Sequence, residues 1–197
     1  ADGVTALEVV AREVAPDHCA TWALLEDVAI GAGRRALALE AMGKQAALLG
    51  DDDDELRSAL STRAVALADG ADDDPAFSYA CLRVAHDADP GDLGLTQRLA
   101  ETAEAMERWS DAVAFLGELA EVEGDDEEVA RLSLRIAAIA DGSLDDPRKA
   151  WDVLLPLAMA GDLGCVEMLQ DLATRRGLDE EFVPRLEELA DKVQDGD

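Results

Sequence analysis

Residues 92–123 read DLGLTQRLAETAEAMERWSDAVAFLGELAEVE, and this stretch decides the fold. Its first half places Leu99, Ala103 and Met106 at steps of three and four residues, which aligns them on one face of a helix. Its second half carries a comparable pairing of small and larger apolar residues. Only a short polar segment separates the halves, so the stretch predicts two neighbouring antiparallel helices.

The same helical periodicity runs along the rest of the chain, and strand alternation is almost absent. Asp74-Pro75 and Asp146-Pro147 are typical helix starts, because Asp caps free amides and Pro suits the first helical position. Further N-cap candidates are Ser110-Asp111, Asp125-Asp126 and Asp162, and candidate stop signals are Gly50, Gly70, Gly124, Gly161 and Gly177. These signals predict an all-α fold of about eleven helices. The expected spans are 4–14, 17–31, 34–49, 54–69, 75–88, 92–107, 110–123, 126–140, 147–160, 163–176 and 180–194.

An internal repeat organises these helices into pairs. In the second helix of four pairs, a small residue is followed four positions later by a larger apolar one. These couples are Ala38 with Met42, Ser78 with Leu82, Ala112 with Leu116, and Ala150 with Leu154. Small residues let two helices approach closely, and the larger residue fills the space one turn on.

The chain resembles the tetratricopeptide repeat family, best over 20–124 and continuously to about residue 173. The resemblance rests on the aromatic Trp22, the Leu99-Ala100 couple, the small residues that open the second helices, and the closing Pro90. It implies a right-handed α-solenoid of about five antiparallel helix pairs. It also implies a concave face lined by the first helices, where such proteins bind a peptide or a helix.

No linker interrupts the pattern, so we expect one helical-repeat domain over 1–197. It would comprise an N-terminal helix within 1–16, helix pairs over 17–176 and a C-terminal capping helix within 178–194. Pro156 and Pro184 fall inside expected helices and should kink or shorten them.

The charge excludes some classes of partner. The chain has 45 acidic residues against 17 Lys and Arg, a formal net charge of −28. Nucleic acids and anionic membranes require clusters of basic residues, so neither is an expected partner. Such acidity is typical of proteins from salt-rich habitats and of grooves for basic partners, and composition leaves both open.

The three cysteines, Cys19, Cys81 and Cys165, lie far apart and form no disulfide framework. We interpret them as reduced thiols, which favours a reducing compartment such as the cytoplasm. The chain begins at Ala1 without an apolar leader, and we expect it to be an excised piece of a longer protein.

No catalytic motif occurs, so we expect no enzymatic activity, cofactor or metal. The rival interpretation is a metal-dependent helical enzyme, with zinc held by His18, Cys19, Cys81 and His86. Acidic runs such as 51–55 and 125–128 fall at expected helix starts, where they complement the helix dipole; weak calcium binding is the alternative.

The sequence therefore predicts a protein-interaction scaffold that binds a basic peptide or helix in an acidic concave groove. Candidate groove residues are polar positions on the first helices: Glu26, Arg63, Gln97, Glu101, Glu104, Arg135 and Gln170. The alternative is a structural or regulatory segment of a larger protein, without a ligand of its own. Homo-oligomerisation stays open. The tryptophans are interpreted as core wedges, with an exposed Trp109 anchor as the rival.

Overall fold

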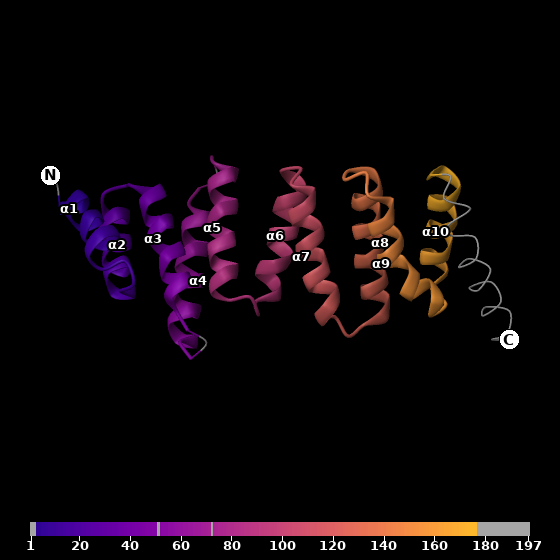
Figure 1. The fold of residues 1–197 in the computed structure, drawn as a ribbon, viewed down its shortest axis with the longest axis horizontal. Helices are drawn as coiled ribbons and strands as arrows, with labels where there is room; N and C mark the ends of the chain where they lie inside the picture. The colour runs from indigo at the N-terminus through magenta and orange to yellow at the C-terminus, as the bar shows by residue number, and fades with distance from the viewer. Residues whose placement is uncertain (1–2, 51, 72, 177–197) are drawn as a thin grey trace. The chain divides into compact units, whose positions relative to one another are not determined.

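The computed structural model describes residues 3–50, 52–71 and 73–176, and the regular structure in this part of the chain is entirely helical. Ten α-helices and a short π-helix follow one another over these residues (Figure 1). The elements are α1 (Gly3–Val9), η1 (Val10–Val14), α2 (Cys19–Gly31), α3 (Arg35–Leu48), α4 (Asp54–Asp69), α5 (Pro75–Ala88), α6 (Leu93–Ala105), α7 (Trp109–Val122), α8 (Asp126–Gly142), α9 (Pro147–Met159) and α10 (Leu163–Arg176). The all-α prediction is confirmed.

The predicted helix spans agree with the observed helices to within about two residues, the usual uncertainty of such boundaries. The first expected helix, 4–14, is one exception, because it divides into α1 and η1. Its final turn is a wide one, in which the Ala15 amide donates to the Val10 carbonyl at 2.9 Å. The expected helix 180–194, with Pro184, lies outside the described residues.

Aspartate caps begin several helices, as the sequence predicts. The Asp74 carboxylate accepts from the Phe77 amide at 3.0 Å. Asp146 does the same for the Lys149 amide at 3.0 Å. Asp125 and Asp162 cap α8 and α10 in the same way. Each cap satisfies amides that the first helical turn leaves without a partner.

The predicted cap at Ser110-Asp111 is wrong. Helix α7 begins earlier, at Trp109, after Glu107 adopts a left-handed conformation with φ of 57°. That turn reverses the chain one residue sooner than expected, so Asp111 lies inside the first helical turn. Its carboxylate accepts from Arg108 Nε at 2.7 Å.

Pro156 lies inside α9, and Gly161 follows its end. Helix α9 continues through Pro156 and ends at Met159, one residue before the expected end. The expected kink or shortening at Pro156 stays a prediction. Gly161 then adopts φ of 100°, a conformation that only glycine reaches without strain. Gly177, another expected stop signal, lies outside the described residues.

The chain divides into two compact units, residues 1–95 and 96–197. In the first unit, α2 packs against α3 and α4 against α5, as expected for consecutive antiparallel helices. In the second unit, α8 packs against α9, and α9 against α10. The single domain expected over 1–197 stays a prediction.

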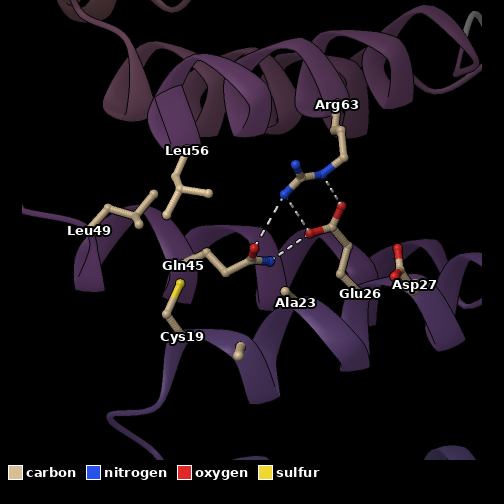
Figure 2. A pocket seen from close by; sticks show the side chains of 9 residues that line it. Cys19, Ala23, Glu26, Asp27, Gln45, Leu49, Leu56 and Arg63 are labelled. Carbon is tan, nitrogen blue, oxygen red and sulfur yellow. Dashed lines mark hydrogen bonds and ion pairs between the residues drawn. The ribbon is translucent and has the colours of Figure 1, made fainter. Parts of the chain in front are cut away.

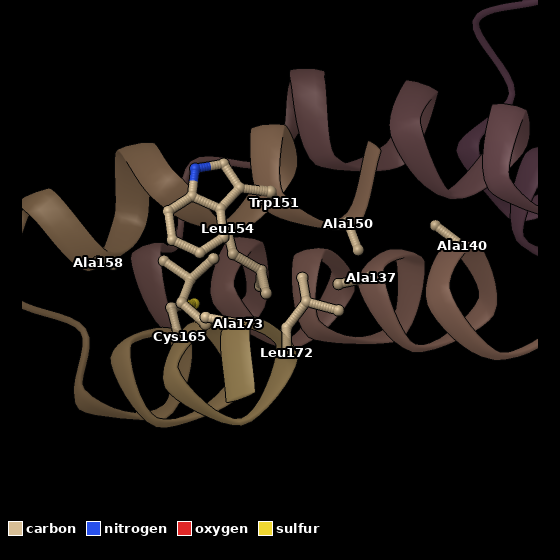
Figure 3. Packing of buried hydrophobic residues seen from close by; sticks show 10 residues of the cluster. Ala137, Ala140, Ala150, Trp151, Leu154, Ala158, Cys165, Leu172 and Ala173 are labelled. Carbon is tan, nitrogen blue, oxygen red and sulfur yellow. The ribbon is translucent and has the colours of Figure 1, made fainter. Parts of the chain in front are cut away.

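Each unit has its own apolar core. In the first, Trp22 and Leu25 of α2 pack with Ala38 and Ala41 of α3. In the second, Trp151 and nine other buried residues join α8, α9 and α10 (Figure 3). The small residues expected at close helix contacts are fully buried at Ala38, Ala112 and Ala150, and half-buried at Ser78.

Candidate interaction site

A buried polar network joins three helices of the first unit. Glu26 of α2 is only 1% exposed. Its carboxylate accepts from Arg63 Nε of α4 at 2.7 Å and from Gln45 Nε2 of α3 at 2.6 Å. Arg63 also reaches the Gln45 side-chain oxygen at 3.3 Å. A buried carboxylate is stable only with such partners, so the network fixes the positions of α2, α3 and α4.

This network lies beside an open pocket of about 480 Å³ (Figure 2). The polar side consists of Glu26, Gln45 and Arg63, with the exposed carboxylate of Asp27 nearby. The remaining lining is mainly apolar: Cys19, Ala20, Ala23, Leu49 and Leu56. An apolar wall beside a few placed polar groups is the usual composition of a binding pocket.

The Cys19 thiol borders this pocket and is half-buried. Burial raises its pKa, and the carboxylates of Asp53 and Glu26 raise it further, against the opposing charge of Arg63. The thiol is the protonated form at neutral pH, so Cys19 contributes an apolar surface to the pocket.

Two of the seven candidate groove residues, Glu26 and Arg63, therefore lie together at one pocket. The expectation that both project into a groove needs revision for Glu26, because its carboxylate is buried beneath Arg63. The Arg63 side chain remains 42% exposed. The charge of Glu26 thus holds Arg63 in place at the edge of the pocket.

The other five candidates lie in the second unit. Gln97 donates to Glu101 at 3.1 Å along α6. Glu104 of α6 forms an ion pair with Arg135 of α8 at 2.8 Å. Gln170 is exposed on α10. The second unit therefore brings Glu104 and Arg135 together and places Gln97 one turn from Glu101.

A related ion-pair cluster joins α8 to α10. Asp141 is 4% exposed and accepts from Arg175 at 2.8 Å and from Arg176 at 2.7 Å. Burial alone would raise the pKa of Asp141, but the two guanidinium groups outweigh it and hold that pKa below its usual range. Arg176 also donates to the Asp141 carbonyl at the end of α8.

These three ion pairs share one arrangement, which the sequence interpretation missed. In each, an acidic residue of one helix forms an ion pair with an arginine on the next helix but one, 31 to 37 positions later. The pairs are Glu26 with Arg63, Glu104 with Arg135, and Asp141 with Arg175 and Arg176. The spacing of the internal repeat could have predicted these ion pairs, because it indicates which helices become neighbours.

The sequence suggested two roles for the tryptophans, as residues of the core or, for Trp109, as an exposed anchor. Trp22 is 2% exposed and Trp151 is fully buried, as core wedges should be. The Trp22 indole donates to the Pro16 carbonyl at 2.8 Å. Trp109 is half-buried at the start of α7, so it is neither a core residue nor a fully exposed anchor.

Over residues 3–50, 52–71 and 73–176, no three His, Cys, Asp or Glu side chains gather closely enough to hold a metal ion. His18 instead shares a hydrogen bond of 2.8 Å with the Thr21 hydroxyl. No helix within the same ranges is long and apolar enough to cross a membrane.

Comparison with known proteins identifies no family: no family model matches the chain, and no curated protein matches it.

Proposed function

We propose that the chain is a non-catalytic protein-interaction scaffold that binds a basic peptide or helix. The observation that carries this proposal is the open pocket between α2, α3 and α4. There the exposed Asp27 carboxylate stands beside an apolar wall, while the charges of Glu26 and Arg63 pair with each other. The net charge of −28 adds long-range attraction for a basic segment.

The proposed architecture is a right-handed α-solenoid similar to tetratricopeptide repeats, with an acidic concave groove. Two packing features support it. Alternate helices contact each other, α3 with α5 and α8 with α10, as they do when helical hairpins stack. The ion pairs between alternate helices, such as Glu104 with Arg135, would hold successive hairpins in register.

The test is a pull-down with the chain at low and moderate salt, followed by titration of the purified partner. We expect affinity to fall at least fivefold between about 0.05 M and about 0.5 M NaCl, because salt screens charge attraction.

Asp27→Asn should weaken binding, whereas Asp152→Asn, at an exposed position of α9, should not. A partner whose affinity ignores salt and Asp27→Asn would contradict the electrostatic part of the proposal. The absence of any partner would contradict the whole.

The second candidate function is a structural segment of a larger protein that spaces or docks other domains. One observation favours it: six of the seven candidate groove residues interact with one another, as the ion pairs Glu26–Arg63 and Glu104–Arg135 and the hydrogen bond Gln97–Glu101. On that interpretation the ion pairs exist to stiffen the array. The same titration separates the two candidates, since a spacer would bind no basic segment through Asp27.

A further inference from the structure

Helix α2 is mostly apolar, and its solvent-facing side carries large apolar side chains on both sides of the exposed Asp27. Its inner side packs Trp22, Leu25 and Ala29 into the core. On its outer side Leu24 is 53% exposed and Ile30 is 47% exposed. Large apolar side chains that lie side by side on the outer face of a helix are typical of an interaction surface. The described residues of the first unit leave about half of Leu24 and of Ile30 uncovered.

The exposed face continues into the pocket. Ala20, Ala23 and Asp27 of α2 line it, and Leu24 and Ile30 are one helical turn away from them. Across the pocket, Leu56 at the start of α4 is 57% exposed. We call this combined area the α2 surface: Ala20, Ala23, Leu24, Asp27, Ile30 and Leu56.

The charge on the α2 surface indicates what covers it. Asp27 is its single ionisable residue; it is exposed, and Leu24 and Ile30 lie three positions before and after it along α2. In the same pocket lining, Glu26 and Arg63 neutralise each other. The α2 surface therefore offers apolar contact around one negative charge, and its complement is an apolar surface around one positive charge.

We propose that the α2 surface docks a basic amphipathic helix of a partner protein. An apolar side chain of that helix enters the pocket between Ala23 and Leu56. A Lys or Arg one turn away reaches the Asp27 carboxylate. From Ala20 to Ile30 the surface extends about 15 Å along α2, the length of about three helical turns. This inference rests on the proposed function and adds the requirement for amphipathic character.

A second copy of the chain is a poor occupant of the same surface. Two copies would each bring a net charge of −28, and neither α2 surface supplies the cation that Asp27 requires. Self-association through α2 would therefore have to overcome strong repulsion between the two negatively charged copies.

The experiment titrates three fluorescently labelled synthetic peptides of about fourteen residues into the full chain. The first places Leu and Lys at helical period, the second is its scrambled isomer, and the third replaces Leu by Gly while keeping every Lys. The variants are Leu24→Ser and Asp27→Asn. The matched controls are Leu163→Ser and Asp152→Asn, at exposed positions of α10 and α9. Circular dichroism checks that each variant keeps its helical content.

We expect the amphipathic peptide to bind at least tenfold more tightly than the other two. Leu24→Ser should remove most of that difference, and Asp27→Asn should weaken binding about fivefold and flatten its salt dependence. Both control variants should bind as the parent chain does.

Four outcomes would overturn the inference. Equal binding of all three peptides would leave the proposed basic partner standing but remove the amphipathic requirement. Loss of binding in the control variants, as much as in Leu24→Ser, would place the site elsewhere. Concentration-dependent dimerisation that Leu24→Ser abolishes would make a second copy the occupant. If no peptide binds although the pull-down captures a basic partner, this inference fails and the proposed function stands; if the pull-down also captures no partner, both fail.

Discussion

At the scale of single residues, the two partners of the Glu26–Arg63 pair differ in their access to water. Glu26 is 1% exposed, whereas the Arg63 side chain is 42% exposed. When one partner is removed, an arginine at the edge of the pocket turns into solvent, but a buried carboxylate stays where it is. The two halves of one ion pair should therefore have unequal effects on stability.

We predict that Arg63→Met lowers the free energy of unfolding by about 3–5 kcal/mol, because it leaves a buried carboxylate without its cation. Glu26→Gln should lower it by only about 1–2 kcal/mol, since the amide still meets Gln45 and Arg63 is free to hydrate. Urea unfolding of both variants measures the difference. Arg131→Met on α8, whose partner Glu128 is not buried, is the control and should change little. Equal losses for Arg63→Met and Glu26→Gln would contradict this account.

Asp141 predicts a pH dependence of stability. Its folded-state pKa is held below its usual range, so the ionised form stabilises the fold. That contribution is fully present above the ordinary carboxyl range, near pH 4, and is lost as the pH falls through the depressed pKa. Asp141→Asn should therefore lower the free energy of unfolding at pH 7 by about 2 kcal/mol, and the deficit should shrink in acid.

Urea titrations of the parent chain and Asp141→Asn at several pH values measure this difference directly. Asp171→Asn is the matched control, because Asp171 bonds Arg175 but its side chain is 60% exposed. Asp171→Asn should lower the free energy of unfolding only slightly, relative to the parent chain, at every pH. A constant deficit for Asp141→Asn down to pH 2 would contradict the ionic explanation.

At the scale of helices, the sequence predicted positions well because the deciding signals are local. Asp74 before Pro75, and Asp146 before Pro147, fix where α5 and α9 begin through contacts within one turn. The prediction failed at Ser110, where Arg108 and a left-handed Glu107 start α7 early. Ser and Asp are good caps in isolation, and the sequence carries no signal for that backbone conformation.

The candidate site was harder to predict than the helices. Helical phase identified Glu26 and Arg63 as polar positions on alternate helices, but it did not reveal that they bond each other beneath a pocket. The apolar lining was missed as well. Leu49 and Leu56 flank the α3–α4 turn, and their common wall depends on how α4 returns against α2. Such tertiary geometry is absent from a periodicity argument.

Helix spacing gives a prediction for Ala150, the small residue near the start of α9. It is fully buried in the cluster with Ala137 and Leu154 (Figure 3). Ala150→Leu should lower the free energy of unfolding by about 1–3 kcal/mol, because the added volume forces α8 and α9 apart. Ala138→Leu, on the exposed side of α8, is the control and should be nearly neutral. Thermal and urea unfolding provide the measurement, and a neutral Ala150→Leu would show that the contact has room to spare.

At the scale of the whole molecule, the net charge opposes the folded state. With 45 acidic residues and 17 Lys and Arg, like charges lie close together over any compact arrangement of the chain. Adding salt screens this repulsion, and it also screens ion pairs such as Glu104–Arg135. The two effects change stability in opposite directions, and their balance decides how salt acts.

We predict that repulsion dominates, so that NaCl raises the melting temperature. Acidic residues greatly outnumber the Lys and Arg residues that could pair with them, and exposed ion pairs contribute little to stability. Between about 0.01 M and about 0.5 M salt the Debye length falls from about 30 Å to below 10 Å, which removes most long-range repulsion. A stabilisation of about 1–2 kcal/mol would raise the melting temperature by about 2–8 °C for a chain of this size.

Thermal unfolding followed by circular dichroism tests this prediction, with choline chloride at matched ionic strength as the control. Screening depends on ionic strength, so both salts should act alike, whereas specific sodium binding to acidic clusters would favour NaCl alone. A melting temperature that falls with both salts would mean that the ion pairs of Glu26 and Asp141 with their arginines outweigh the repulsion among the excess acids. In that case the acidity would serve to hold the helices together, and a basic partner would no longer be needed to explain it.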